Sequence, residues 1–209
     1  MKGVQQPPEY HPEGDVWVHT LLLLQNLDHP TLTLAMGALL HDVGKPPTFR
    51  IAERIRFDGH VEEGVVLTRA IMNRLRFSRD EMERVEGLVD NHMRFKDVPR
   101  MKESTLKRFL RLPDFDEHLE LHRLDCLAGS GRLETYNFVR ESYAAMATEI
   151  VRPAPLITGR ELIAAGYHPG PQFKEMLHAV EDAQLEGTIT TAGEALELLR
   201  DRYGKTASS

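Results

Sequence analysis

The sequence predicts an all-α fold: a helical bundle followed by a short helical tail. Apolar residues recur at helical spacing along most of the 209-residue chain. Capping signals and Gly or Pro stops divide this pattern into helices of ordinary length. No strand of any length can be recognised. These three observations together favour a bundle over a sheet-based architecture.

The N-terminal half is expected to contain four helices. Residues 1–15 are rich in Pro and Gly and should form a loop. Residues 45–58 contain Pro46 and Pro47, show no sustained period, and are expected to be a loop that grips substrate or acts as a lid. The expected helices span residues 15–27, 31–43, 59–75 and 78–92, the last beginning at a capping box.

The C-terminal half continues the helical pattern. Pro153 and Pro155 mark a joint, so we expect a first domain of residues 1–152 and a helical tail of residues 153–209. The expected helices span residues 104–110, 113–128 and 133–150 in the first domain, and 158–165, 172–186 and 191–202 in the tail.

Composition limits the class of protein. With 41% hydrophobic and 28% charged residues, the chain should be a globular protein with a sizeable core. Its apolar runs are too short to span a membrane and its start lacks a signal-peptide core, so we expect a cytoplasmic protein with no membrane partner. The single cysteine, Cys126, forms no internal disulfide and is expected in the core.

Charge is unevenly distributed. The net charge of −6 argues against broad, non-specific binding to nucleic acid. A basic stretch nevertheless follows His92. A solvated helix face is the favoured interpretation, and a phosphate-attracting rim is the alternative. The basic residues are Arg94, Lys96, Arg100, Lys102, Lys107, Arg108 and Arg111.

The candidate site is centred on the adjacent pair His41 and Asp42. The pair ends an apolar, helix-like run, and Gly44 then Pro46 stop that run. An imidazole and a carboxylate in so apolar a setting would be costly to bury unless something paired them. A metal ion would pair both.

Further candidate ligands lie in similar settings. His19 and Asp125 each interrupt a leucine-rich helical segment, and His60 and His92 lie between them in the sequence. A lone histidine such as His19 is more often a hydrogen-bonded core residue, but the joint occurrence favours metal binding. The predicted metal ligands are His19, His41, Asp42, His60, His92 and Asp125.

The ligand types indicate the ion. Imidazole and carboxylate together suit Mn²⁺, Fe²⁺, Co²⁺, Ni²⁺ or Zn²⁺, with Mg²⁺ as the alternative. Six ligands are too many for one ion with an open position, which indicates two ions bridged by Asp42, with one ion as the alternative. One site would contain His19, Asp42 and Asp125, with or without His41, and the other would contain Asp42, His92 and either His41 or His60. Such ions would activate water and hold phosphate oxygens, with Asp42 as a catalytic residue.

Other polar residues have expected roles around this site. Lys45 is expected to be catalytic and to bind phosphate, and Arg94 to bind substrate. His122 would orient Asp125 or contact substrate, whereas His118 is expected to be exposed. The cluster of His11, Glu13 and Asp15 is interpreted mainly as helix capping.

The ligand pattern resembles the HD superfamily of metal-dependent phosphohydrolases, named for a pair represented here by His41-Asp42. Over residues 7–200 the chain is most similar to the HD domain and tail of the tRNA nucleotidyltransferase/poly(A) polymerase (CCA-adding) family. One departure is that no nucleotidyltransferase head is recognised, since no Gly-Ser with a following Asp-x-Asp is found. The motifs are residues 10–16 (YHPEGDV), Gly59-His60, 159–162 (GREL) and 166–171 (GYHPGP).

The resemblance implies a phosphohydrolase acting on nucleotides or phosphorylated RNA ends, as a phosphatase, 2′-nucleotidase or 2′,3′-cyclic phosphodiesterase. It also implies a role at the mouth of the site as the alternative to capping for His11, Glu13 and Asp15. Hydrolysis of a signalling nucleotide fits the ligands equally well and the tail less well. The alternative is a non-catalytic RNA-binding module, with tRNA as a possible partner, that works with a separately encoded nucleotidyltransferase head. Substrate and oligomeric state depend on pocket shape and surface patches, which the sequence leaves open.

Overall fold

The computed structural model describes residues 1–146 and 154–204, and it confirms the all-α fold. The chain divides into two compact units. The first contains residues 1–100 and 112–143, and the second contains residues 101–111 and 144–209. The expected domain boundary between residues 152 and 153 lies outside the described residues. The segment 101–111, expected in the first domain, belongs to the same compact unit as the tail.

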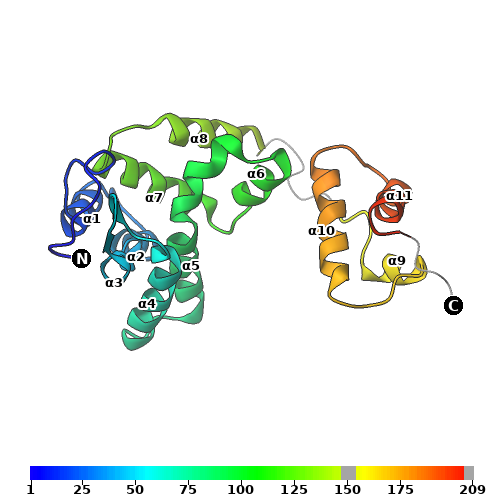
Figure 1. Cartoon of the computed structure of the whole chain (residues 1–209), viewed down its shortest axis with the longest axis horizontal. Coiled ribbons are helices and arrows are strands. Elements are labelled where there is room, and N and C mark those ends of the chain that lie inside the picture. Colours follow the sequence, from blue (N-terminus) through cyan, green and yellow to red (C-terminus); the bar gives the residue numbers. More distant parts are fainter. Residues whose placement is uncertain (147–153, 205–209) are drawn as a thin grey trace. The chain divides into compact units, whose positions relative to one another are not determined.

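The first unit contains the helices that surround the candidate site. In Figure 1, α4 and α5 lie side by side. Its elements are α1 (Val16–Gln25), α2 (Leu32–Leu40), α3 (Lys45–Thr48), β1 (Arg50–Ile51), β2 (Ile55–Arg56), α4 (His60–Arg74), α5 (Arg79–Asn91), the 3₁₀ segment η1 (His92–Arg100), α7 (Phe115–Ala128) and the start of α8 (Glu134–Met146).

The observed helices match the expected ones to within a few residues, with three differences. Residues 45–58, expected to be a loop, contain α3 and an antiparallel β1–β2 hairpin. The chain continues past His92 as a 3₁₀ segment that has no clear period in the sequence. The end of the helix expected over residues 133–150 lies partly outside the described residues, since α8 is described to Met146.

Helix starts in this unit follow the sequence signals. The Asp15 carboxylate accepts hydrogen bonds from the backbone N–H groups of Trp17 and Val18, at 2.8 and 3.1 Å, and so caps α1. Ser78 and Glu81 form the expected capping box before α5. These caps fix where α1, which carries His19, and α5, which His92 follows, begin.

Two glycines allow the helices to approach closely. A Cβ on Gly37 of α2 would lie 2.6 Å from Cδ1 of Leu88 on α5. A Cβ on Gly44 would lie 2.0 Å from the carbonyl oxygen of His60. Gly44 therefore lets the turn after His41-Asp42 pack directly against the start of α4, which brings His60 towards that pair.

The second unit has a core of its own. It contains α6 (Glu103–Leu110), α9 (Gly159–Ala164), α10 (Gln172–Leu185) and α11 (Ala192–Tyr203), the last three forming the yellow-to-red group in Figure 1. Capping boxes begin α9 and α11. The buried core residues include Ile157, Leu162, Met176, Val180, Ala195 and Leu199.

Three of the seven basic residues make contacts inside this second unit. Arg108 pairs with both Glu181 and Asp182 on α10, and Arg111 donates to Glu181 at 2.9 Å. Lys107 donates to the carbonyl of Leu185 at 3.0 Å. These three residues join α6 to α10, whereas Lys96, Arg100 and Lys102 are exposed, as the favoured interpretation of a solvated face expects.

Within the described ranges, the longest apolar helices fall short of what crossing a membrane requires.

Candidate metal centre

Three buried histidines of the first unit are held in the same way. Each Nδ1–H donates to a backbone carbonyl three residues earlier: His41 to Ala38 at 3.0 Å, His60 to Phe57 at 2.8 Å and His92 to Val89 at 2.6 Å. With the proton on Nδ1, each Nε2 carries a free lone pair. All three Nε2 atoms are buried without a hydrogen-bond partner among the described residues.

Buried polar atoms without partners are costly, so their convergence on one place fits a ligand that supplies the missing bonds. Ligand atoms of Asp42, His60 and His92 all lie within 4.8 Å of one another. Imidazole nitrogens and a carboxylate oxygen at this separation are a suitable donor set for a divalent transition metal. The residues present therefore fit the expected ion.

Asp42 lies at the middle of the cluster and is 2% exposed. Its Oδ2 is 3.2 Å from His41 Nε2 and 2.7 Å from Lys45 Nζ, and its Oδ1 is 3.8 Å from His92 Nε2. The 3.2 Å contact lacks hydrogen-bond geometry, which is why His41 Nε2 counts as unpartnered. Burial would raise the pKa of Asp42, but the charges of His41 and Lys45 outweigh it and hold that pKa well below its usual range.

A second group adjoins the first. His19 Nε2 lies 2.9 Å from Asp125 Oδ1, and ligand atoms of His19, His41 and Asp125 lie within 4.8 Å of one another. Ring centroids are 5.4 Å apart for His19 and His41, and 5.5 Å apart for His41 and His92. The structure therefore brings the six candidate ligands into two adjoining groups, and it places Asp42 with His60 and His92 and not with His19. How these residues divide between ions stays a prediction.

Burial sets the protonation of these imidazoles. It lowers the pKa of His92 to about 4, with a further lowering from His41, and it also lowers the pKa of His60. The pKa of His41 is raised instead, because the attraction of Asp42 exceeds the effect of burial. Near neutral pH, His60 and His92 are therefore unprotonated, as metal ligands must be.

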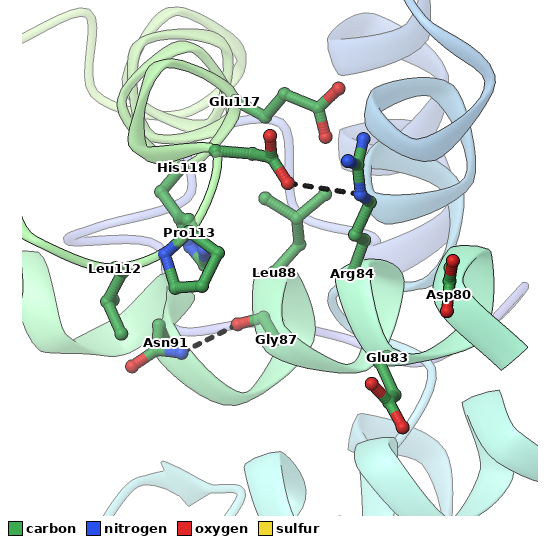
Figure 2. A pocket seen from close by; sticks show the side chains of 11 residues that line it. Asp80, Glu83, Arg84, Gly87, Leu88, Asn91, Leu112, Pro113, Glu117 and His118 are labelled. Atoms are coloured by element: carbon green, nitrogen blue, oxygen red, sulfur yellow. Dashed lines mark hydrogen bonds and ion pairs between the residues drawn. The ribbon is translucent and has the colours of Figure 1, made fainter.

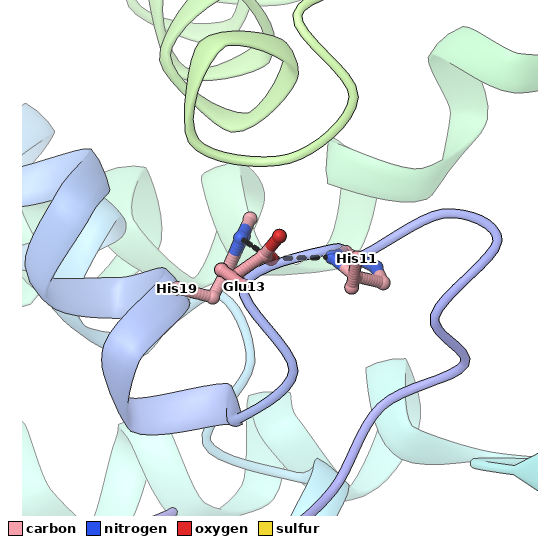
Figure 3. A group of neighbouring side chains, drawn as sticks. All are labelled: His11, Glu13 and His19. Atoms are coloured by element: carbon pink, nitrogen blue, oxygen red, sulfur yellow. Dashed lines mark hydrogen bonds and ion pairs between the residues drawn. The ribbon is translucent and has the colours of Figure 1, made fainter.

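Glu13 lies beside His19 in the structure, and capping was only the first of its two expected roles. Its Oε1 accepts from His19 Nδ1 at 2.6 Å and from His11 Nδ1 at 2.8 Å (Figure 3). This contact directs His19 Nε2 towards Asp125, as a carboxylate does behind a metal-binding histidine. The signal was the polar cluster just before His19, which was interpreted mainly as capping. Asp15 has that role.

Gln6 also takes part in the site. It is 1% exposed, and its Oε1 accepts from Lys45 Nζ at 2.6 Å. Lys45 is itself 6% exposed, so Asp42 and Gln6 together hold a buried ammonium beside the cluster. Nothing in the Pro-rich N-terminal sequence distinguished Gln6, because its role depends on the chain folding back over α3.

The predicted substrate residues Arg94 and His122 contact Asn91 and Phe95, which belong to neither ligand group. Arg94 donates to Asn91 Oδ1 at 2.8 Å. His122 stacks on Phe95 with ring centroids 4.2 Å apart, and burial lowers its pKa to about 4. Their contact with substrate stays a prediction.

A separate pocket of about 320 Å³ lies between α5, α7 and the loop before α7 (Figure 2). An ion pair of 3.1 Å joins Arg84 and Asp114 across it. His118 lines this pocket and is 6% exposed, so the expectation that it is a surface residue is wrong. None of the metal-ligand candidates lines the pocket.

Comparison with known proteins gives a match to one family model. The model described as HD domain matches residues 15–123, which include all the proposed ligands except Asp125. This range covers more than half of the 209 residues.

Relatives extend the similarity over most of the chain. A CC-adding tRNA nucleotidyltransferase of Thermus thermophilus is 35% identical over 92% of this chain and 46% of its own length. An A-adding tRNA nucleotidyltransferase of Deinococcus radiodurans is 31% identical, over 87% and 45%. A multifunctional CCA protein of Legionella pneumophila is 28% identical, over 90% and 46%. The chain thus spans less than half the length of these curated relatives.

Proposed function

Because the chain belongs to the HD domain family, we propose that it is a metal-dependent phosphohydrolase that acts on nucleotides or phosphorylated RNA ends. The observation that carries this proposal is the set of three buried Nε2 atoms without partners around Asp42. A domain with no ligand to bind would gain stability by replacing these polar atoms with apolar ones.

The proposed ligands form two groups, so we infer two ions. His19, His41 and Asp125 would hold one, and Asp42, His60 and His92 the other, with Asp42 close enough to His41 to serve both. Bound there, Mn²⁺, Fe²⁺, Co²⁺, Ni²⁺ or Zn²⁺ would supply an activated water and would polarise phosphate oxygens. Mg²⁺ is a weaker candidate because most of the donors are imidazoles.

The chain's own residues would prepare the site for an anion. Lys45 neutralises Asp42 in the structure, and its buried ammonium is placed to pair with a phosphate oxygen of the substrate. Gln6 holds this ammonium in position, and Glu13 holds His19. Burial of these groups keeps bulk water away and so strengthens each electrostatic contact.

The substrate class rests on the relatives. The similar proteins are named as tRNA nucleotidyltransferases, so their names give tRNA as the substrate. We therefore favour an RNA end, or the mononucleotide that corresponds to it, and a cytoplasmic location. The reaction would be that of a phosphatase, 2′-nucleotidase or 2′,3′-cyclic phosphodiesterase. In this proposal the first unit carries the reaction, and the tail resembles that of tRNA nucleotidyltransferases.

The test uses purified full-length chain loaded in turn with each metal. We expect metal-stimulated hydrolysis of at least one of 2′-AMP, 2′,3′-cAMP and p-nitrophenyl phosphate, and its loss in Asp42→Ala. The matched control is Asp80→Ala, an exposed carboxylate on α5 outside both ligand groups. Absence of turnover with every metal, or equal turnover in Asp42→Ala, would overturn the proposal.

A second candidate is a non-catalytic module that binds tRNA or partners a separately encoded nucleotidyltransferase head. The favouring observation is that the relatives are tRNA nucleotidyltransferases. Salt-sensitive tRNA binding that persists in Asp42→Ala, together with no hydrolysis, would support this candidate. Hydrolysis with weak tRNA binding would remove it.

A further inference from the structure

The β1–β2 hairpin carries an arrangement of charge that the proposed chemistry does not explain. Arg50 pairs directly with Arg56, and Ile51 with Ile55. The backbone of Ala52 donates to the carbonyl of Arg54 at 3.1 Å, which extends the register. Side chains alternate between the two faces of a hairpin. Arg50, Arg54 and Arg56 therefore share one face, which we call the arginine face.

Within the described part of the chain, the arginine face forms no ion pair. All three arginines are exposed, and the carboxylate of Glu53 lies in the turn between Ala52 and Arg54. Arg69 and Arg79 of this unit pair with Glu86 and Glu83, whereas Arg74 and Arg76 resemble the arginine face in having no ion pair within the described part of the chain. Like charges directly opposite one another destabilise a strand pair. A single charge would suffice to protect the edge of so short a hairpin, so Arg50 opposite Arg56 indicates an anionic ligand.

The hairpin is attached directly to the metal centre. The carbonyl of Phe57, the residue after β2, accepts the hydrogen bond from His60 Nδ1. The Phe57 ring lies 5.4 Å from Lys45 Nζ and 5.9 Å from the Phe49 ring. Arg56 is four residues from His60, so their Cα atoms are within about 14 Å. An anion on the arginine face is therefore held near the proposed reaction site.

We propose that the arginine face binds the phosphodiester backbone of a single-stranded nucleic acid whose terminal phosphate enters the metal centre. This inference rests on the proposed function and narrows its substrate from mononucleotides to strand ends. Successive phosphates can each take a guanidinium, and guanidinium binds phosphate in a bidentate way. His41, Asp42 and His92 are at most 6% exposed, so a thin single strand fits the access better than a duplex.

The first measurement is binding without catalysis. Anisotropy of a labelled single-stranded RNA ten-mer is followed in EDTA over a range of salt, with the full chain and with Arg50→Gln/Arg56→Gln. We expect about tenfold weaker binding in the double variant. The slope of log K against log salt should fall by about 1.4, since each lost contact to a single strand removes about 0.7.

The matched control is Arg74→Gln/Arg76→Gln, which removes the same charge from exposed positions at the far end of α4, about 20 Å from His60. We expect this control to bind RNA as the unchanged chain does. An equal loss of RNA affinity in both double variants would show that the effect depends only on net charge, and it would overturn the proposal. Unchanged binding in Arg50→Gln/Arg56→Gln would overturn it as well.

A second measurement separates this inference from the proposed function. With metal-loaded protein, the ratio of kcat/KM for a 3′-phosphorylated oligonucleotide to that for 2′-AMP should fall about tenfold in Arg50→Gln/Arg56→Gln. If no substrate is hydrolysed but RNA binding still depends on the arginines, the phosphohydrolase assignment fails and the strand-binding face stands. If hydrolysis occurs with an unchanged ratio, the arginine face does not select strands and the inference fails.

Discussion

The candidate metal centre of the first unit and the α6–α10 interface of the second are both clusters of charged and polar side chains, but their hydrogen bonds differ. At α6–α10, Arg108 and Arg111 pair with carboxylates of the same unit, and we call this the closed cluster. At the candidate metal centre, His41, His60 and His92 each keep a buried Nε2 without a partner among the described residues, and we call this the open cluster.

This difference teaches that unsatisfied buried atoms mark a site better than density of charge does. Partly exposed ion pairs contribute about 0–1 kcal/mol each to the free energy of unfolding. As contacts between helices, they require no ligand. A buried donor or acceptor without a partner costs about 1–3 kcal/mol, so several in one place require compensation from a ligand.

The largest effect is expected at the centre of the open cluster. Asp42→Asn keeps the shape of the side chain but removes the negative charge, which Asp42 would supply to both proposed ions. We expect a fall in metal-stimulated kcat of about 1,000-fold or more, equal to about 4 kcal/mol. Elemental analysis of the same protein should show loss of bound metal. Full metal content with full activity would show that the cluster is not the metal centre.

Metal removal should destabilise only the unit that holds the open cluster. At ligand concentrations of 100 to 1,000 times Kd, binding adds about 3–4 kcal/mol to the free energy of unfolding. The single tryptophan, Trp17, lies two residues from His19 in α1, so its fluorescence reports on the first unit. We expect EDTA to lower the urea midpoint seen by Trp17. An unchanged midpoint would contradict a bound ion.

Glu13→Gln tests the residue that orients His19. The amide can no longer act as a charged acceptor for His19 Nδ1, so metal affinity should fall about 10- to 100-fold. The measurement is metal titration by isothermal calorimetry, with kcat at saturating metal as the second readout. A nearly unchanged kcat at saturation would identify a positioning role. The control is Glu9→Gln, an exposed residue of the same N-terminal segment.

The smallest effect is expected at the closed cluster. Arg108→Ala removes its pairs with Glu181 and Asp182, and we expect a loss of about 1 kcal/mol in the free energy of unfolding. Metal content and hydrolysis of 2′-AMP should not change. The loss should shrink in high salt, because exposed ion pairs are screened. A fall in metal binding would show that the two clusters are not independent.

The fold was largely predictable because its signals are local. The caps at Ser78 and Thr191 and the apolar periodicity each act over a few neighbouring residues. The β1–β2 hairpin was missed because two-residue strands have no period to detect. The grouping of residues 101–111 with the tail was missed because it depends on partners more than 60 residues away, such as Arg108 with Glu181.

The sequence by itself determined the helices and the kinds of side chain at the site, since propensity, caps and the cost of burying His and Asp are local properties. Only the tertiary structure decided which of them meet. It brought His60 and His92 to Asp42, His19 to Asp125 and Glu13 to His19, and it paired Arg108 with Glu181 and Asp182. The reason is physical: a partner is chosen by distance in the folded chain, and sequence spacing does not encode that distance.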